Sequence, residues 1–217
     1  MSPLCLDTRC LWYNQSAFWR RSCGFCLKKD GDVCHVAPGG QRCWAVFSGD
    51  TAPALLALGA EIEIVSPRGT RCLPLAQFYT GDGMARMKLE PDEVLTRVCV
   101  PAESASLRGA YLKFRLRNSI DYPLAGVAVA LRPAPDGSCE WGRVAVTALN
   151  PAPLIVRGSE EALRGARLTD ELLERLAQLA SRTVKPLTTS ASTPEYRREI
   201  ARVMVKRAVR QAWKTDN

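Results

Sequence analysis

The sequence predicts an α+β fold in which antiparallel strands come first and helices follow. Short strand-like apolar stretches, separated by turns that contain Gly and Pro, lie between residues 61 and 148. Apolar residues then recur at helical spacing in the stretches after residue 159. With 217 residues, 47% hydrophobic and 24% charged, the composition is that of a globular protein with one large or two small domains.

The first predicted elements are a short helix and a pair of strands. Asp50 or Thr51 can cap the helix, which has Pro53 in its first turn. Its body lies at 54–58, and Gly59 ends it. Strands are predicted at 61–66, 71–75 and 93–101, with a turn at 67–70 between the first two.

The second half of the chain is predicted to be a three-stranded antiparallel sheet followed by a helical bundle. A linker at 102–107 leads into it, and Pro135-Asp136-Gly137 marks a hairpin turn. The strands are expected at 110–117, 125–132 and 141–148, and the helices at 159–163, 169–182 and 194–214.

The net charge of +8 is concentrated near the two ends of the chain. Nucleic-acid binding through the basic C-terminal stretch is one interpretation. The basic residues of 195–210 alternate with apolar ones at helical spacing, so we predict instead a packed helix with a solvated basic face. Neither an apolar stretch of about 18 residues nor a secretory signal is present, so we expect a cytoplasmic location and no membrane or nucleic-acid binding.

Nine cysteines are many for a cytoplasmic chain, and most of them lie in the first 43 residues. In a reducing compartment, such a group is more typical of metal ligands than of disulfides. The aromatic-rich stretch around it is predicted to be an irregular loop. Cys72, Cys99 and Cys139 lie in strand-like apolar stretches instead and are predicted to be small buried hydrophobic residues.

Four of the early cysteines, Cys10, Cys26, Cys34 and Cys43, together form the pattern C-x15-C-x7-C-x8-C. It is not a compact zinc ribbon, and four thiolates spread over one loop suit an iron–sulfur cluster as well as zinc. Cys23-Gly24-Phe25-Cys26 also forms a C-x-x-C, which leaves a zinc site or a redox dithiol open. His35 is the single histidine and is expected behind the ligands or on the surface.

Three parts of the early chain carry a resemblance to a known family: residues 5–16, Cys34-His35-Val36-Ala37-Pro38, and Cys43. They are similar to the β subunits of 4-hydroxybenzoyl-CoA reductases. These are FAD-binding medium subunits of the xanthine dehydrogenase, or molybdenum hydroxylase, family. Further similar stretches follow in the family order at 48–58, 74–82, 89–95, 111–115 and 192–198. The resemblance implies a second FAD-binding α/β lobe at 1–103, with an iron–sulfur loop at about 5–49, and a flavoprotein C-terminal domain like that of CO dehydrogenase at 107–217.

The resemblance also implies the roles of individual residues. The four cysteines at the shared spacing would ligate a [4Fe–4S] cluster, and Asp50 would lie against FAD; its other reading is a helix cap. Lys113 would stabilise reduced, anionic flavin, and Leu95 would pack on the flavin ring. An exposed strand lysine and a core leucine are the alternatives for these two. Arg115, Arg117 and Asp121 would line the same cleft or pair with one another.

The implied function is electron transfer between the cluster and FAD, toward the [2Fe–2S] centres of a small subunit. The family reaction, the reductive removal of a phenolic hydroxyl from an aryl-CoA, would occur on a large molybdopterin subunit, and the assembly would be a homodimer of heterotrimers. Relatives begin with a further lobe that carries a Gly-rich pyrophosphate loop. We therefore expect a split subunit or a fragment that binds FAD weakly or not at all by itself. The alternative is a zinc-stabilised, non-catalytic interaction module.

Overall fold

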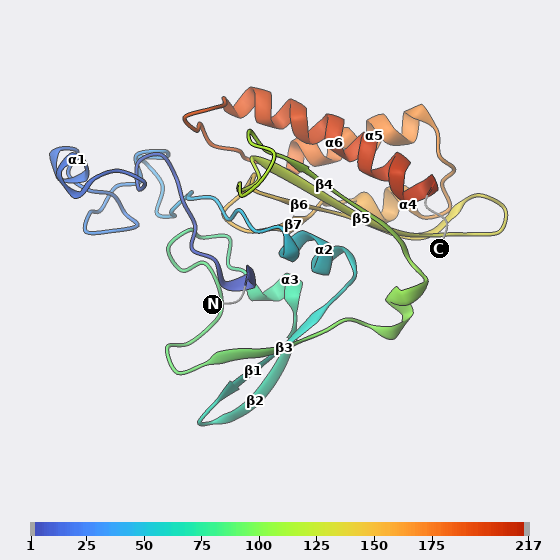
Figure 1. Ribbon diagram of the computed structural model, residues 1–217, viewed down its shortest axis with the longest axis horizontal. Helices are drawn as coiled ribbons and strands as arrows, with labels where there is room; N and C mark the ends of the chain where they lie inside the picture. The colour runs from blue at the N-terminus through green and yellow to red at the C-terminus, as the bar shows by residue number, and fades with distance from the viewer. Residues whose placement is uncertain (1–2, 215–217) are drawn as a thin grey trace.

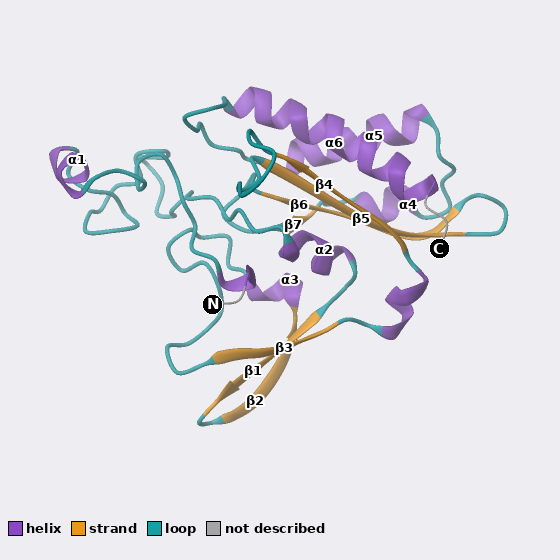
Figure 2. Ribbon diagram, in the orientation of Figure 1, coloured by secondary structure: helices purple, strands orange, loops and turns teal. Residues whose placement is uncertain are grey.

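The computed structural model describes residues 3–214, which form two antiparallel sheets with helices packed on them (Figures 1 and 2). The smaller sheet has the strand order β2-β1-β3 and the larger one the order β4-β5-β6-β7. The strands of the smaller sheet are β1 (Glu61–Ser66), β2 (Gly69–Pro74) and β3 (Val94–Cys99). Those of the larger sheet are β4 (Arg108–Phe114), β5 (Ala125–Pro133), β6 (Cys139–Thr147) and β7 (Leu154–Ile155). The predicted α+β class is confirmed.

Helices cover both faces of the larger sheet. Figure 1 shows α4, α5 and α6 on one face, while α2 lies between the other face and the smaller sheet. The helices are α1 (Ala17–Ser22), α2 (Thr51–Ala57), α3 (Leu75–Phe78), α4 (Ser159–Leu163), α5 (Asp170–Thr183) and α6 (Pro194–Lys214), with 3-10 turns at Pro3–Cys5 and Ala102–Ser106.

The alternation along β5 explains why both faces are covered. Val127, Val129 and Leu131 point into the core that includes α5 and α6. Ala128 and Ala130 point the other way, into a second core with Leu56 of α2 and Ile62 of β1. Small side chains on that face leave room for a helix to pack closely. The two predicted units therefore share a core.

Several predicted bounds hold, and the differences have local causes. α4 and α6 begin and end where predicted, and α5 begins at Asp170 because the Thr169 side chain accepts a hydrogen bond from the Leu172 N–H at the helix start. The larger sheet has a fourth strand, β7, which is too short to show a sequence period and pairs with β6 through Val146 and Leu154. Residues 1–2 and 215–217 of the predicted units lie outside the described residues.

Two of the three cysteines predicted to be buried are not. Cys139 is fully buried, but Cys72 and Cys99 are exposed. Each is paired in register with a glutamate of β1, Cys72 with Glu63 and Cys99 with Glu61, so they lie on the polar face of the smaller sheet. Within residues 3–214, no helix is long and apolar enough to cross a membrane.

Candidate functional site

The four cysteines at the shared spacing come together in the irregular N-terminal segment, which Figure 2 shows to be mostly loop. Cys10, Cys26, Cys34 and Cys43 all line one cavity, together with Trp12, Lys28 and His35. Three of the four are buried, and Cys10 is half-buried. The fold therefore brings four thiols that are far apart in sequence to the wall of one small cavity.

Backbone groups orient these thiols. The Tyr13 N–H donates to Cys10 Sγ at 3.4 Å, and the Ala45 N–H donates to Cys43 Sγ at 3.4 Å. Gly83 lies against Cys43 and Ala45: a Cβ on Gly83 would come within 2.9 Å of Cys43 Sγ and of the Ala45 backbone. Only glycine leaves room for the chain to pass so close to this sulfur.

Burial controls the protonation of the thiols. It raises the pKa of Cys43 to about 11, and the neighbouring Cys34 and Cys10 add to this, against the lowering effect of the Ala45 N–H and Lys28. Burial also raises the pKa of Cys10, with smaller contributions from Cys26 and Cys34. Without a cation the Cys10 and Cys43 thiols are therefore protonated near neutral pH, and a metal or cluster that takes them as thiolates must displace their protons.

The side chains as placed do not form a site for a single ion. Among residues 3–214, no group of three or more His, Cys, Asp or Glu side chains is close enough to hold one metal ion. His35 Nε2 is hydrogen-bonded to the Phe25 carbonyl, and its ring stacks on Trp12 with centroids 4.6 Å apart. His35 is thus part of the cavity wall, as expected, and Cys5 and Cys23 are not among the residues that line the cavity.

A second group of polar side chains surrounds Asp50 at the start of α2. Its carboxylate accepts a hydrogen bond from the Tyr111 hydroxyl at 2.6 Å and one from Lys113 Nζ at 2.7 Å. Tyr111 and Lys113 are two residues apart on β4, so both side chains leave the same face of the sheet. Asp50 is the N-cap residue of α2, as predicted, but its side chain makes no hydrogen bond to the helix start.

The Asp50 group is held by close packing. Burial raises the pKa of Tyr111, and the hydrogen bond to Asp50 raises it further, so the phenol stays protonated and donates. Lys113 is paired in register with Gly126, which is paired with Thr147. A Cβ on Gly126 would lie 2.8 Å from the Tyr111 hydroxyl oxygen and 2.6 Å from Thr147 Cγ2. Sequence reasoning missed Tyr111, although its two-residue spacing from Lys113 was a usable signal.

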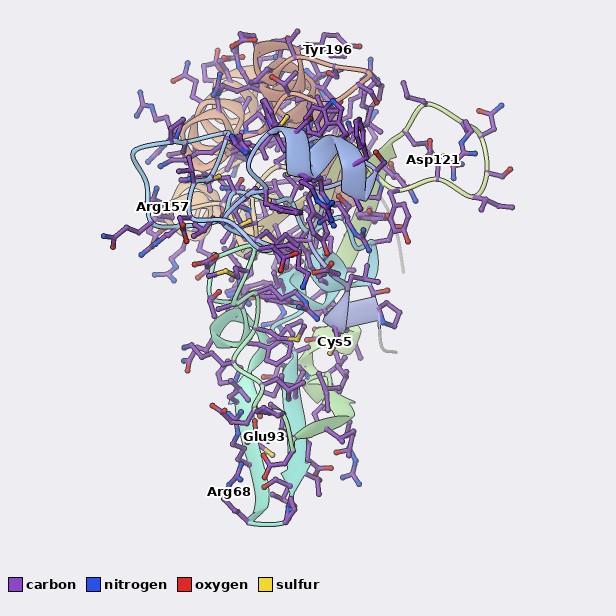
Figure 3. The ribbon with its side chains drawn as sticks, turned by 90° about the vertical axis from the view of Figure 1, so that its left-hand side faces the viewer. Cys5, Arg68, Glu93, Asp121, Arg157 and Tyr196 are labelled. Atoms are coloured by element: carbon purple, nitrogen blue, oxygen red, sulfur yellow. The ribbon has the colours of Figure 1, made fainter. Side chains whose placement is uncertain are left out.

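Leu95 and Arg117 have other partners than the Asp50 group. Leu95 is on β3 of the smaller sheet, opposite Ile64, and packs against the second core. Arg117 binds Asp121, with its N–H 3.1 Å from one carboxylate oxygen and Nη2 3.4 Å from the other. Asp121 is on a loop that projects beyond the larger sheet (Figure 3). Arg117 and Asp121 therefore pair with each other, and Asp121 also lines the cleft described next.

An open cleft of about 930 Å³ lies between the cysteine-rich segment, the loop that joins β4 to β5, and the loop and first turn at the start of α6. Its walls include Ser48, two residues before Asp50, together with Asp121 and the buried Arg197. Cys10 lines this cleft as well as the cysteine cavity. The two hollows therefore meet at one cysteine.

Comparisons with known proteins agree with this architecture. Residues 35–103 match the FAD binding domain in molybdopterin dehydrogenase, and residues 110–212 match the CO dehydrogenase flavoprotein C-terminal domain. The chain is 29% identical to the xanthine dehydrogenase FAD-binding subunit of Escherichia coli O157:H7 over 80% of its own length and 59% of that protein. It is 30% identical to the carbon monoxide dehydrogenase medium chain of Hydrogenophaga pseudoflava, over 84% of its own length and 59% of that protein.

Solved structures extend the likeness to the fold. Carbon monoxide dehydrogenase from Hydrogenophaga pseudoflava, in a form lacking the Mo-pyranopterin moiety, superimposes with a TM-score of 0.71 at 32% identity. That match covers 76% of this chain and 56% of the other. The chain thus spans somewhat more than half the length of the relatives that it matches. By sequence and by fold, it belongs to the FAD-binding medium subunits of the xanthine dehydrogenase and CO dehydrogenase family, the molybdenum hydroxylases.

Proposed function

We propose that this chain is the electron-transfer subunit of a molybdenum hydroxylase-type complex, with FAD beside Asp50 and a [4Fe–4S] cluster in the cysteine cavity. The observation that carries the proposal is the convergence of Cys10, Cys26, Cys34 and Cys43 on one cavity. The FAD-binding relatives named above support the proposal that this chain holds FAD. The cysteine cavity is the basis for the cluster.

The donor set fits a cluster. A cubane takes one thiolate at each iron, so its ligands surround a volume and need not meet at one ion. The four cysteines line one cavity with a volume of only about 10 Å³, so their side chains must move outward before either a cluster or zinc can bind. N–H groups directed at Cys10 Sγ and Cys43 Sγ stabilise thiolates, and sulfur hydrogen bonds are among the features that set cluster potentials. When bound, the cluster supplies one-electron transfer.

The Asp50 group fits one wall of a flavin site. The Asp50 side chain is 45% exposed, and its oxygens have lone pairs left for ligand hydroxyl or N–H groups. The Lys113 ammonium group binds Oδ2 of the Asp50 carboxylate, and the Tyr111 hydroxyl binds Oδ1. FAD supplies the exchange between two-electron and one-electron chemistry. Contact between Leu95 and the flavin remains part of the proposal.

The substrate and partners follow from the resemblance in the cysteine loop. We infer reductive dehydroxylation of an aryl-CoA on a large molybdopterin subunit, with a [2Fe–2S] small subunit between the two. A homodimer of heterotrimers is the proposed assembly, and 1–103 and 107–217 are its two proposed units in this chain. A zinc-stabilised interaction module is the second candidate, because four thiols around one cavity, three of them buried, also suit zinc.

Metal analysis after anaerobic reconstitution tests the proposal. The full chain is incubated with ferrous iron and sulfide, or with zinc, and iron, acid-labile sulfide and zinc are counted per chain. We expect iron and sulfide in equal amounts, and their loss in Cys34→Ser. The control is Cys72→Ser, which removes an exposed thiol outside the cavity. Zinc binding without iron or sulfide uptake overturns the cluster and favours the interaction module.

A further inference from the structure

Lys28 is a buried lysine on the wall of the cysteine cavity. Only 6% of its side chain is exposed, whereas the side chain of the adjacent Lys29 is 56% exposed. Lysines are almost never buried without partners, because the ammonium group loses its hydration. The position of Lys28 therefore needs a compensating environment.

That environment satisfies the charged form of the lysine. Nζ donates to Asp7 Oδ1 at 2.9 Å, to Thr8 Oγ1 at 2.8 Å and to the Gly83 carbonyl at 2.7 Å. An ammonium group has three N–H donors, and each of these has its acceptor. The charge also lies 5.1 Å from the centroid of the Tyr13 ring, within cation–π range.

More cations than one carboxylate can balance gather around Asp7. Asp7 is the carboxylate bound to Lys28, and the same carboxylate lies 3.6 Å from Arg86 and 3.7 Å from Arg9. Three cations therefore share Asp7, and Asp82, whose Oδ1 accepts from the Cys43 N–H at 3.2 Å, is a second carboxylate beside the cavity that four cysteines line. Four thiolates around a cluster would add negative charge within the cavity that Lys28 also lines.

We infer that Lys28 is a positioning residue that raises the reduction potential of a cluster in the cysteine cavity by placing a fixed buried positive charge against it. The inference rests on the proposed function, because it requires the cluster. Reduction adds one negative charge to the cluster, and a nearby cation in a poorly hydrated site stabilises that added charge. Net charge, sulfur hydrogen bonds and exposure are what set such potentials.

Lys28 also ties three chain segments together, so the experiment must separate charge from structure. Lys28→Met removes the cation, and Asp7→Asn removes the opposing anion while keeping an oxygen that can accept from Nζ. Lys29→Met is the matched control, since it removes an exposed lysine next in sequence. Each reconstituted full chain is titrated with redox mediators while the reduced cluster is followed by electron paramagnetic resonance.

Opposite shifts are expected from the two charge changes. In Lys28→Met the potential moves to more negative values, and the ratio of reduced to oxidised cluster at fixed potential falls on the order of tenfold, as for a charge ~10 Å away at an effective dielectric constant of ~20. In Asp7→Asn the potential moves to more positive values, and Lys29→Met leaves it unchanged. A structural role alone would not produce opposite signs.

The outcomes separate this inference from the proposed function. If the wild-type chain takes up no iron and sulfide, both fail together. If it assembles a cluster and Lys28→Met and Asp7→Asn both keep the wild-type potential, only the role of Lys28 is overturned. If Lys28→Met does not retain a cluster, Lys28→Gln decides, since it keeps a donor for the same acceptors without the charge: a more negative potential supports the inference, and an unchanged or more positive potential overturns it.

Discussion

Gly126→Ala tests how tightly the Asp50 group is held. A Cβ at this position would lie 2.6 Å from Thr147 Cγ2 and 2.8 Å from the Tyr111 hydroxyl oxygen. Neither neighbour yields easily. Thr147 is buried and donates to the Gly49 carbonyl at 3.0 Å, and Tyr111 is bound to Asp50.

The expected cost follows from two opposing contributions. Forcing a methyl group into such a space costs about 1–3 kcal/mol of stability. Replacing glycine by alanine also reduces the entropy of the unfolded chain, which returns about 0.4–1 kcal/mol where the backbone is compatible. We therefore expect the free energy of unfolding to fall by about 1–2 kcal/mol. Gly109→Ala on β4 is the control, because the nearest atom to its Cβ is the Val129 carbonyl oxygen at 3.5 Å, an ordinary contact.

Urea unfolding of single and double variants identifies the source of the cost. Thr147→Ser removes the clashing methyl group and keeps the hydroxyl that donates to Gly49. The penalty of Gly126→Ala should therefore be at least halved in that background, a coupling typical of residues in contact. Equal stability of Gly126→Ala and Gly109→Ala, or the same penalty with and without Thr147→Ser, would refute the packing described for this group.

Two further variants test buried polar groups outside the proposed sites. Cys139 is fully buried, and burial raises the pKa of its thiol from 9.0 to about 11. Its contribution to stability is thus complete below pH 9 and lost as the pH rises through about 11. The stability of the wild type relative to Cys139→Ala should fall by about 2 kcal/mol over that range; a pH-independent difference in urea unfolding contradicts this. The Arg197 guanidinium donates to the carbonyls of Leu124, Leu187 and Ala148 from a buried position. Arg197→Met should cost about 2–4 kcal/mol by leaving these acceptors unpaired, and a melting temperature unchanged from wild type would contradict that role.

Local patterns along the sequence determined most of the secondary structure. The apolar periods placed α4 and α6 at their observed bounds, and alternation placed β1 where it is found. The family resemblance, with its four cysteines at this spacing, selected the four thiols that line one cavity. The helix and strand periods depend on neighbours a few residues away, which is the range over which such periods are informative.

The tertiary structure alone decided which polar groups meet. Lys28 lies in the stretch predicted to be an irregular loop, where no local pattern indicates burial, yet its side chain is buried because Asp7, Thr8 and the Gly83 carbonyl reach it from segments far along the chain. Alternation likewise could not say that Cys72 and Cys99 lie on the polar face of a sheet. Period-two patterns assign residues to faces, and only the packing of whole elements decides which face is buried and what lies opposite.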